Sequence, residues 1–364
     1  MQQQIITAEN NYEQLDSWIR GTGAGTVMLV CDSSLQFLDI RHYFDSVESR
    51  LGITLVRFTD IVPNPSYESV VEGVSLFNSV GCGAIIAVGG GSSMDVAKCI
   101  KLYSNMDPAI NYLKQEIVPN DIPLLAVPTT AGTGSEATRY AVIYFEGAKQ
   151  SITSDSIIPS VVLFDHSVLR TLPVYQKKST MMDALCHATE SVWSVNRTDE
   201  SYGYAREAIG LILSNIGGYL ANDDSANHEM LRAANLAGHA INITQTTAGH
   251  AMCYKITSLF GSAHGHAAAL CDRVLFPWMA EITDPAIASV MADLASCYGC
   301  SSASEAAAKF VSIFDSLSLE VPSATEDELA ELCSSVNPVR LKNHPVTLDH
   351  ETIEMLYRKI LNVK

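Results

Sequence analysis

The sequence predicts an α/β protein in which a parallel sheet with covering helices is followed by an all-helical domain. In the first half, short apolar runs alternate with helical patterns. In the second half helix follows helix, with no convincing strand. This change of pattern lies between residues 165 and 175, and we expect domains of residues 1–170 and 171–364. A chain of 364 residues is long enough for two domains of that size.

Five apolar runs are predicted to form the strands of the sheet. They are continuous and rich in β-branched residues, which is typical of strands that are buried on both faces of a parallel sheet. Helical patterns at 67–79 and 93–103 lie between them, and this alternation indicates an α/β layer. The expected strands are 26–31, 55–58, 84–88, 124–128 and 161–165.

Charge and composition argue against several classes of partner. The formal net charge is −17 and the isoelectric point is about 4.9. Nucleic acid and anionic membranes are therefore not expected partners, because binding them requires a basic patch. No apolar run approaches the length of a membrane span. The cysteines are scattered and the N-terminal segment lacks the pattern of a secretion signal, so we expect a cytoplasmic protein with reduced thiols.

Two loops that follow expected strands combine glycines with hydroxyl side chains. Glycines let the backbone approach a phosphate closely, and the N–H groups that open a helix bind anions. Because the two loops follow neighbouring strands of the chain, they suit a pyrophosphate better than a single phosphate. The first loop contains Gly89, Gly90, Gly91 and Ser92, and the second contains Thr129, Thr130, Thr133 and Ser135.

Asp32 stands at the end of the first expected strand. A carboxylate at this position can accept hydrogen bonds from an adenosine ribose and repels a 2′-phosphate, which favours NAD over NADP. From its spacing alone, an aspartate that caps a helix or stabilises a turn is an equally good interpretation.

Asp183 and His187 lie four residues apart in a helical pattern, and His250 and His264 follow downstream. Residues at this spacing share one face of a helix and can hold a single cation. One carboxylate with three imidazoles suits Fe, Zn, Co or Ni better than Ca or Mg, which prefer oxygen ligands. A capped or solvated Asp–His pair on a helix surface is the alternative interpretation.

Together these motifs resemble the iron-containing (group III) alcohol dehydrogenase family over essentially the whole chain. The segment 62–65, both glycine-containing loops, the Asp183–His187 pair, His264 with Gly265, and the tail 337–346 follow the order of that family. Within it, the segments 193–196 and 250–254 look most like the phosphonoacetaldehyde reductase branch.

The resemblance implies the dehydroquinate synthase-like fold of iron alcohol dehydrogenases, with a Rossmann-like dinucleotide-binding domain and then a metal-binding domain. It implies Fe(II), with Zn(II) as the second choice, and NAD(H) rather than NADP(H). It also suggests a homodimer or larger homo-oligomer. The implied metal ligands are Asp183, His187, His250 and His264. The implied cofactor-binding residues are Asp32, Asn64, Gly89, Gly90, Gly91, Ser92, Asp95, Thr129, Thr130, Thr133 and Ser135.

The implied reaction is reversible hydride transfer between nicotinamide and a small aldehyde or its primary alcohol. For the phosphonoacetaldehyde reductase branch, the pair is phosphonoacetaldehyde and 2-hydroxyethylphosphonate. Tyr254 stands where many members carry a histidine linked to proton transfer, and His266 follows the last ligand, so these two are the catalytic candidates. A supporting or surface role for His266 stays open. The candidates for contacting an anionic substrate are Arg139, Ser194 and Asn196, with Lys149 and Arg197 as further ones.

Three other functions stay open at this stage. One is a general short-chain or polyol alcohol dehydrogenase of the same family. The second is a dehydroquinate synthase-like lyase, which the resemblance disfavours because such enzymes carry a glutamate in place of Asp183. The third is a catalytically silent nucleotide-binding protein, against which the intact set of candidate ligands argues.

Overall fold

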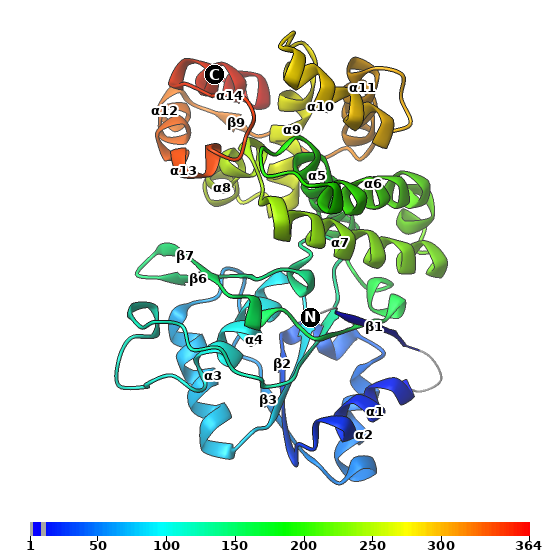
Figure 1. Ribbon diagram of the computed structural model, residues 1–364, viewed down its shortest axis with the longest axis vertical. Coiled ribbons are helices and arrows are strands. Elements are labelled where there is room, and N and C mark those ends of the chain that lie inside the picture. Colours follow the sequence, from blue (N-terminus) through cyan, green and yellow to red (C-terminus); the bar gives the residue numbers. More distant parts are fainter. Residues whose placement is uncertain (1–2, 9–11) are drawn as a thin grey trace. The chain divides into compact units, whose positions relative to one another are not determined.

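The computed structural model describes residues 3–8 and 12–364 and divides into two compact units (Figure 1). The first unit comprises Met1–Thr130 and Gly134–Leu172, and the second comprises Ala131–Thr133 and Pro173–Lys364. The division after Leu172 lies close to the expected end of the first domain at residue 170. The second hydroxyl-rich loop is divided between the units, because Ala131–Thr133 belongs to the second.

The first unit is built on a six-stranded parallel sheet with the order β1-β8-β5-β4-β2-β3. The predicted parallel sheet is confirmed, and five of its strands are those expected from the sequence. These are β2 (Thr26–Cys31), β3 (Thr54–Phe58), β4 (Ala84–Gly89), β5 (Leu124–Pro128) and β8 (Val161–Phe164). The sixth, β1 (Gln4–Thr7), was not predicted, because its two apolar residues are flanked by polar ones and do not form a continuous apolar run.

Helices connect these strands and place the candidate residues. In the sheet β2 lies next to β4, and β4 lies next to β5, so the loops after all three strands emerge at one edge. An antiparallel hairpin, β6 (Tyr140–Phe145) and β7 (Ala148–Thr153), was missed by the sequence analysis. Its connection is Glu146-Gly147, both with positive φ. The helices of this unit are α1 (Glu13–Thr22), α2 (Arg41–Leu51), α3 (Tyr67–Val80) and α4 (Gly91–Tyr103).

The second unit is helical, as predicted, with α5 (Val174–Trp193) buried along most of its length. The expectation of no strand there was wrong in one detail. Two-residue strands β9 (Ser323–Ala324) and β10 (Asn362–Val363) pair in parallel, and they are too short to produce a periodic pattern. The other helices are α6 (Asp199–Leu220), α7 (Asp224–Thr244), α8 (Ala248–Phe260), α9 (His264–Ala280), α10 (Pro285–Cys297), α11 (Ala303–Ser316), α12 (Glu326–Ser335), α13 (Pro338–Leu341) and α14 (His350–Ile360). Over residues 3–8 and 12–364, none of the helices is long and apolar enough to cross a membrane.

Candidate metal centre and phosphate loops

The carboxyl ends of β2 and β4 lie next to each other, and Asp32, Gly89 and Ser93 are in contact there. The Asp32 carboxylate accepts hydrogen bonds from the Ser34 N–H at 2.8 Å and from the Ser93 hydroxyl at 2.9 Å. Gly89 has a φ of 154°, and a Cβ there would overlap the Ser93 side chain. Glycine is therefore required at this position, both for its backbone conformation and for the close packing. Asp32 does cap the turn that follows β2, as in the alternative interpretation, and it lies beside the first glycine-containing loop.

The two predicted phosphate loops lie side by side. The Thr129 N–H donates to the Gly89 carbonyl at 3.0 Å, and a Cβ on Gly90 would lie 3.5 Å from the Thr130 hydroxyl. Gly90 caps α4, so the amides of Gly91 and Ser92 belong to the first turn of this helix. The N–H groups of a first turn have no partner within the helix and attract anions. The start of α4 therefore offers backbone N–H groups to which a phosphate could bind.

Asp95 and Ser135 form a hydrogen-bonded network with the buried Lys98, which the sequence analysis did not single out. The Ser135 hydroxyl donates to Asp95 Oδ1 at 2.8 Å, and Lys98 Nζ donates to Ser135 Oγ at 3.0 Å. Asp95 Oδ2 also accepts from the Val142 N–H at 3.0 Å. Burial lowers the pKa of Lys98 to about 8. The network joins α4 to Ser135 of the second loop and to Val142 of β6. The spacing of three residues from Asp95 was the signal for Lys98.

Asn64 and Thr133 are the remaining two cofactor candidates. Asn64 is exposed and has a φ of 59°, a conformation that asparagine tolerates better than most residues. Thr133 belongs to the second unit, whereas Thr129, Thr130 and Ser135 belong to the first.

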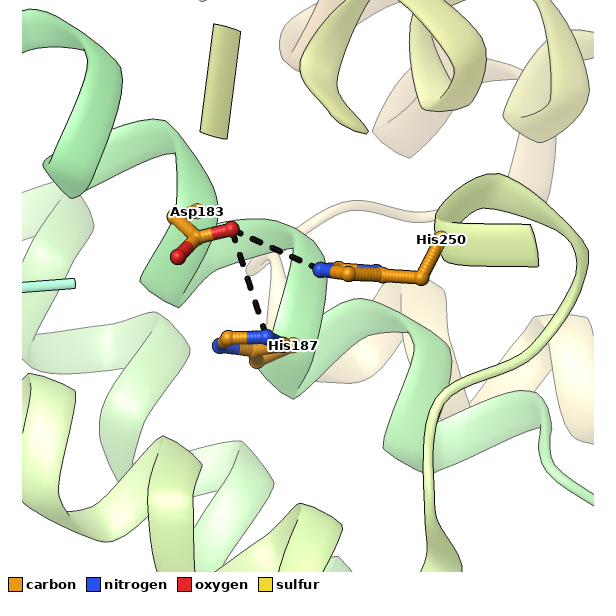
Figure 2. A group of neighbouring side chains, drawn as sticks. All are labelled: Asp183, His187 and His250. Carbon is orange, nitrogen blue, oxygen red and sulfur yellow. Dashed lines mark ion pairs between the residues drawn. The ribbon is translucent and has the colours of Figure 1, made fainter. Parts of the chain in front are cut away.

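The four candidate metal ligands converge from three helices. Asp183 and His187 lie on α5, His250 lies in the first turn of α8, and His264 begins α9. Figure 2 shows Asp183 Oδ1 facing both His187 and His250, and the corresponding Nε2 atoms lie 4.0 and 3.4 Å from it. The Nε2 of His264 lies 3.8 Å from the same oxygen. Asp183, His187 and His250 are buried, whereas the His264 side chain is 39% exposed. His264 therefore completes the group from its accessible side.

The donor set fits a divalent transition metal. In the described part of the chain, Asp183 Oδ1 and His250 Nε2 are buried and have no hydrogen-bond partner. Buried polar atoms without partners are costly, and a cation between them removes that cost. A carboxylate oxygen with imidazole nitrogens suits iron or zinc.

The electrostatics of the cluster match this interpretation. Burial lowers the pKa of His187 to about 4, which keeps its imidazole neutral and able to bind a metal. Burial also opposes a charge on His250, but Glu190 and Asp183 outweigh it and raise the pKa of His250 to about 10. Burial opposes the charge of Asp183 as well, yet the three histidines hold its pKa well below the usual range. Because a ligand histidine must be neutral, a metal bound at this site would displace the His250 proton.

Glu190 holds His250 in place, although the sequence analysis did not single it out. Its carboxylate contacts His250 Nδ1 and accepts from the His250 N–H at 3.1 Å. It also accepts from the backbone N–H and the hydroxyl of Thr247. This arrangement directs His250 Nε2 toward Asp183, as carboxylates commonly do for ligand histidines. Glu190 lies seven residues after Asp183 and three after His187, so the face shared on α5 was the available signal.

Two glycines allow the three helices to approach one another. A Cβ on Gly265, directly after His264, would overlap the Ser179 carbonyl and lie 2.5 Å from Asp183 Cβ. A Cβ on Gly249, directly before His250, would overlap Asp272 and lie 2.8 Å from Glu190 Oε1. Each ligand histidine outside α5 thus has a neighbouring glycine where its helix touches the cluster.

The two catalytic candidates lie in different surroundings. The Tyr254 ring stacks on the His264 ring with the centroids 5.7 Å apart and 18° between the planes. Burial raises the pKa of the Tyr254 hydroxyl, which stays protonated at neutral pH. His266 is buried, and its Nδ1 lies 3.1 Å from the Tyr175 hydroxyl, with Phe314 on another side. The structure therefore brings Tyr254, but not His266, against a candidate metal ligand.

The substrate candidates are engaged in other contacts. The Ser194 hydroxyl and the Asn196 amide both donate to the Thr244 carbonyl, at 3.1 and 3.3 Å. Arg139 pairs with Asp155 at 3.2 Å, and Arg197 pairs with Asp293 at 2.7 Å. Ser194 and Arg197 line a hollow of about 440 Å³ at the end of α5. By helix geometry, Ser194 lies roughly 10 Å along α5 from His187.

The structure combines an α/β unit that carries two glycine-containing loops with a helical unit that carries a candidate ligand set for a transition metal. Comparison with known families gives this combination its name. Residues 2–166 match the model of iron-containing alcohol dehydrogenases, and residues 177–361 match the C-terminal model of the same family. The chain belongs to the iron-containing alcohol dehydrogenase family.

Individual relatives agree with this family. The chain is 32% identical to 1,3-propanediol dehydrogenase of Klebsiella pneumoniae over 74% of its own length and 71% of that protein. It is 34% identical to aldehyde-alcohol dehydrogenase 2 of Entamoeba histolytica over 60% of its own length, but the match spans only 27% of that longer protein. The solved structure of sulfoacetaldehyde reductase from Bifidobacterium kashiwanohense, in complex with NAD+, shares the fold with a TM-score of 0.87. It is 24% identical, with 98% of this chain and 96% of that one covered.

Proposed function

We propose that this protein is a metal-dependent, NAD(H)-linked oxidoreductase that interconverts a small aldehyde and its primary alcohol. The observation that carries the proposal is the convergence of Asp183, His187 and His250, with two buried atoms that lack hydrogen-bond partners within the described residues. Membership of the iron-containing alcohol dehydrogenase family supports it.

The metal proposed for this site is Fe(II), with Zn(II) as the alternative for the same ligands. Asp183, His187, His250 and His264 would hold it, and Glu190 would keep His250 oriented. When bound, the metal supplies Lewis-acid polarisation of the substrate oxygen. Tyr254 lies against His264, where it can shield the ligand ring from water and donate a hydrogen bond to a polar group.

NAD(H) is the cofactor that we propose, rather than NADP(H). The amides that open α4 at Gly91 and Ser92 and the neighbouring Thr129–Thr130 segment would bind its pyrophosphate. Asp32, at the end of β2, places a carboxylate where a 2′-phosphate would be repelled. A homodimer or larger assembly in the cytoplasm completes the proposal.

Phosphonoacetaldehyde, reduced to 2-hydroxyethylphosphonate, is the specific substrate that we propose. Its support is the resemblance of 193–196 and 250–254 to the phosphonoacetaldehyde reductase branch. The alternative within the family is a short-chain alcohol or diol, and the relative named 1,3-propanediol dehydrogenase favours it.

A substrate screen on iron-reconstituted protein tests the proposal. NADH and NADPH are supplied in parallel with phosphonoacetaldehyde, acetaldehyde and 3-hydroxypropionaldehyde. For the reverse direction, NAD+ and NADP+ are supplied with a polyol, and metal content is measured on the same sample. We expect NADH oxidation with at least one aldehyde and a lower rate with NADPH. Metal-loaded protein that turns over neither cofactor with any aldehyde or alcohol contradicts the dehydrogenase assignment.

A further inference from the structure

Arg340 stands beside the candidate metal centre without an acidic partner. It lies on the short helix α13, and its Nη1 donates to the Tyr254 hydroxyl at 3.1 Å. Its guanidinium carbon lies 5.1 Å from the centroid of the Tyr254 ring, a cation–π contact. The side chain is half-buried. Two contacts with one tyrosine thus fix the direction of the guanidinium.

The arginines elsewhere show why this position is unusual. Arg139, Arg197 and Arg358 each pair with a carboxylate, at 3.2, 2.7 and 2.8 Å. In the part of the chain that the structure describes, Arg340 has no carboxylate within ion-pair distance. Arg20 and Arg206 share this property, but both are exposed. In a chain of net charge −17, a half-buried guanidinium without a carboxylate is a place for an external anion.

Tyr254 connects this guanidinium to the metal ligands. The ring of Tyr254 stacks on His264, and His264 Nε2 lies 3.8 Å from Asp183 Oδ1. The Tyr254 centroid lies 5.7 Å from the His264 centroid and 5.1 Å from the Arg340 guanidinium carbon. The guanidinium is therefore at most about 11 Å from the His264 ring. A short molecule can therefore place an oxygen at the ligands and an anionic group at Arg340. A guanidinium has five N–H donors, and only one of them is used by the Tyr254 hydroxyl.

We propose that Arg340, oriented by Tyr254, binds an anionic group of the substrate and makes this site selective for short aldehydes that end in a tetrahedral oxyanion. Phosphonate and sulfonate are the chemical class, because a guanidinium fork matches two of their oxygens. This inference rests on the proposed function and assigns its specificity to a residue outside the candidates drawn from the sequence. Arg139 and Arg197 are less suited, since each already holds a carboxylate.

A pair of substrates matched in shape tests the inference. Phosphonoacetaldehyde ends in a charged phosphonate, whereas 3,3-dimethylbutanal ends in an uncharged tert-butyl group of similar shape. The measured quantity is the ratio of kcat/KM for the first aldehyde to kcat/KM for the second. We expect Arg340→Gln to lower this ratio at least thirtyfold and Arg340→Lys to restore part of it, because lysine keeps the charge but lacks the fork. Arg206→Gln, at an exposed arginine of α6, is the control and should leave the ratio within twofold.

A binding measurement separates this inference from the proposed function. Calorimetric titration of the metal-loaded protein with methylphosphonate should show binding that weakens at least tenfold in Arg340→Gln and not in Arg206→Gln. If the wild-type protein reduces no aldehyde, the proposed function fails, while this titration still decides whether Arg340 binds the anion. An unchanged substrate ratio with unchanged methylphosphonate binding overturns the inference. A lower affinity of Arg340→Gln for NADH, together with an unchanged substrate ratio, also overturns the inference. Arg340 would then bind the cofactor phosphates.

Discussion

The two candidate sites differ in whether their polar side chains are hydrogen-bonded to one another. In the first unit, Asp95, Ser135 and Lys98 satisfy one another through hydrogen bonds of 2.8 to 3.0 Å. In the second unit, Asp183 Oδ1 and His250 Nε2 face one another but, among the described residues, have no hydrogen-bond partner. The difference follows from the ligand that each site suits. Backbone amides can bind a phosphate, so side chains beneath them serve as support, whereas a metal needs the side-chain atoms themselves.

The largest effect is expected when Asp183 is removed, because the three histidines of the candidate metal centre all face its carboxylate. Asp183→Ala should abolish metal binding and lower kcat/KM for the best aldehyde at least a thousandfold, about 4 kcal/mol of transition-state stabilisation. Metal content by mass spectrometry and NADH oxidation measure the two effects. Asp199→Ala, at an exposed residue of α6, is the control. Full metal content in Asp183→Ala would show that the cluster is not the metal site.

Disrupting the hydrogen-bonded network of Asp95, Lys98 and Ser135 should lower stability and leave metal binding unchanged. Lys98→Met removes a buried charged donor from Ser135 and from the Thr138 and Tyr140 carbonyls, and should lower the free energy of unfolding by about 3–5 kcal/mol. Urea denaturation measures this, and Lys114→Met at an exposed lysine should change it by less than about 0.5 kcal/mol. The double variant with Asp95→Asn should cost less than the sum of the single ones. Additive costs would mean that the two side chains do not act as a pair.

Close packing at the metal centre gives the next effect. Gly265→Ala adds a methyl group against the Ser179 carbonyl and Asp183, and we expect a loss of about 1–3 kcal/mol in stability with weaker metal binding. Gly210→Ala on α6 has open space and should instead stabilise the protein by about 0.5–1 kcal/mol. Thermal unfolding of both variants, with and without metal, compares them. Equal behaviour of the two would refute the close approach of α9 to α5.

The smallest effect is expected at Glu190, which contacts His250 and is not one of the four candidate metal ligands. Glu190→Gln removes the charge that orients His250 and should weaken metal affinity 10–100-fold, measured by competition with a chelator. The exposed Glu281→Gln is its control. Circular dichroism of the metal-free variant shows whether the fold persists. An intact fold with unchanged affinity would leave Glu190 only a structural role as the cap of α8.

Local patterns in the sequence were enough to predict the architecture. Continuous apolar runs predicted β2, β3, β4, β5 and β8, because burial on both faces of a parallel sheet imposes such runs. The spacing of Asp183 and His187 also carried information, since one helical turn places them on one face. The strand β1 was not predictable in this way because only two of its four residues are apolar, and β9 and β10 because two residues are too few for a pattern.

The sequence by itself determined the fold class, the glycine-containing loops and a set of four candidate ligands. Only the tertiary structure decided which side chains support them, because those contacts join residues that lie far apart in the chain. Glu190 reaches His250 across sixty positions, Lys98 reaches Ser135 across thirty-seven, and Arg340 reaches Tyr254 across eighty-six. Periodicity reports which face of an element is buried, but the partner on the other side is set by how helices and strands pack.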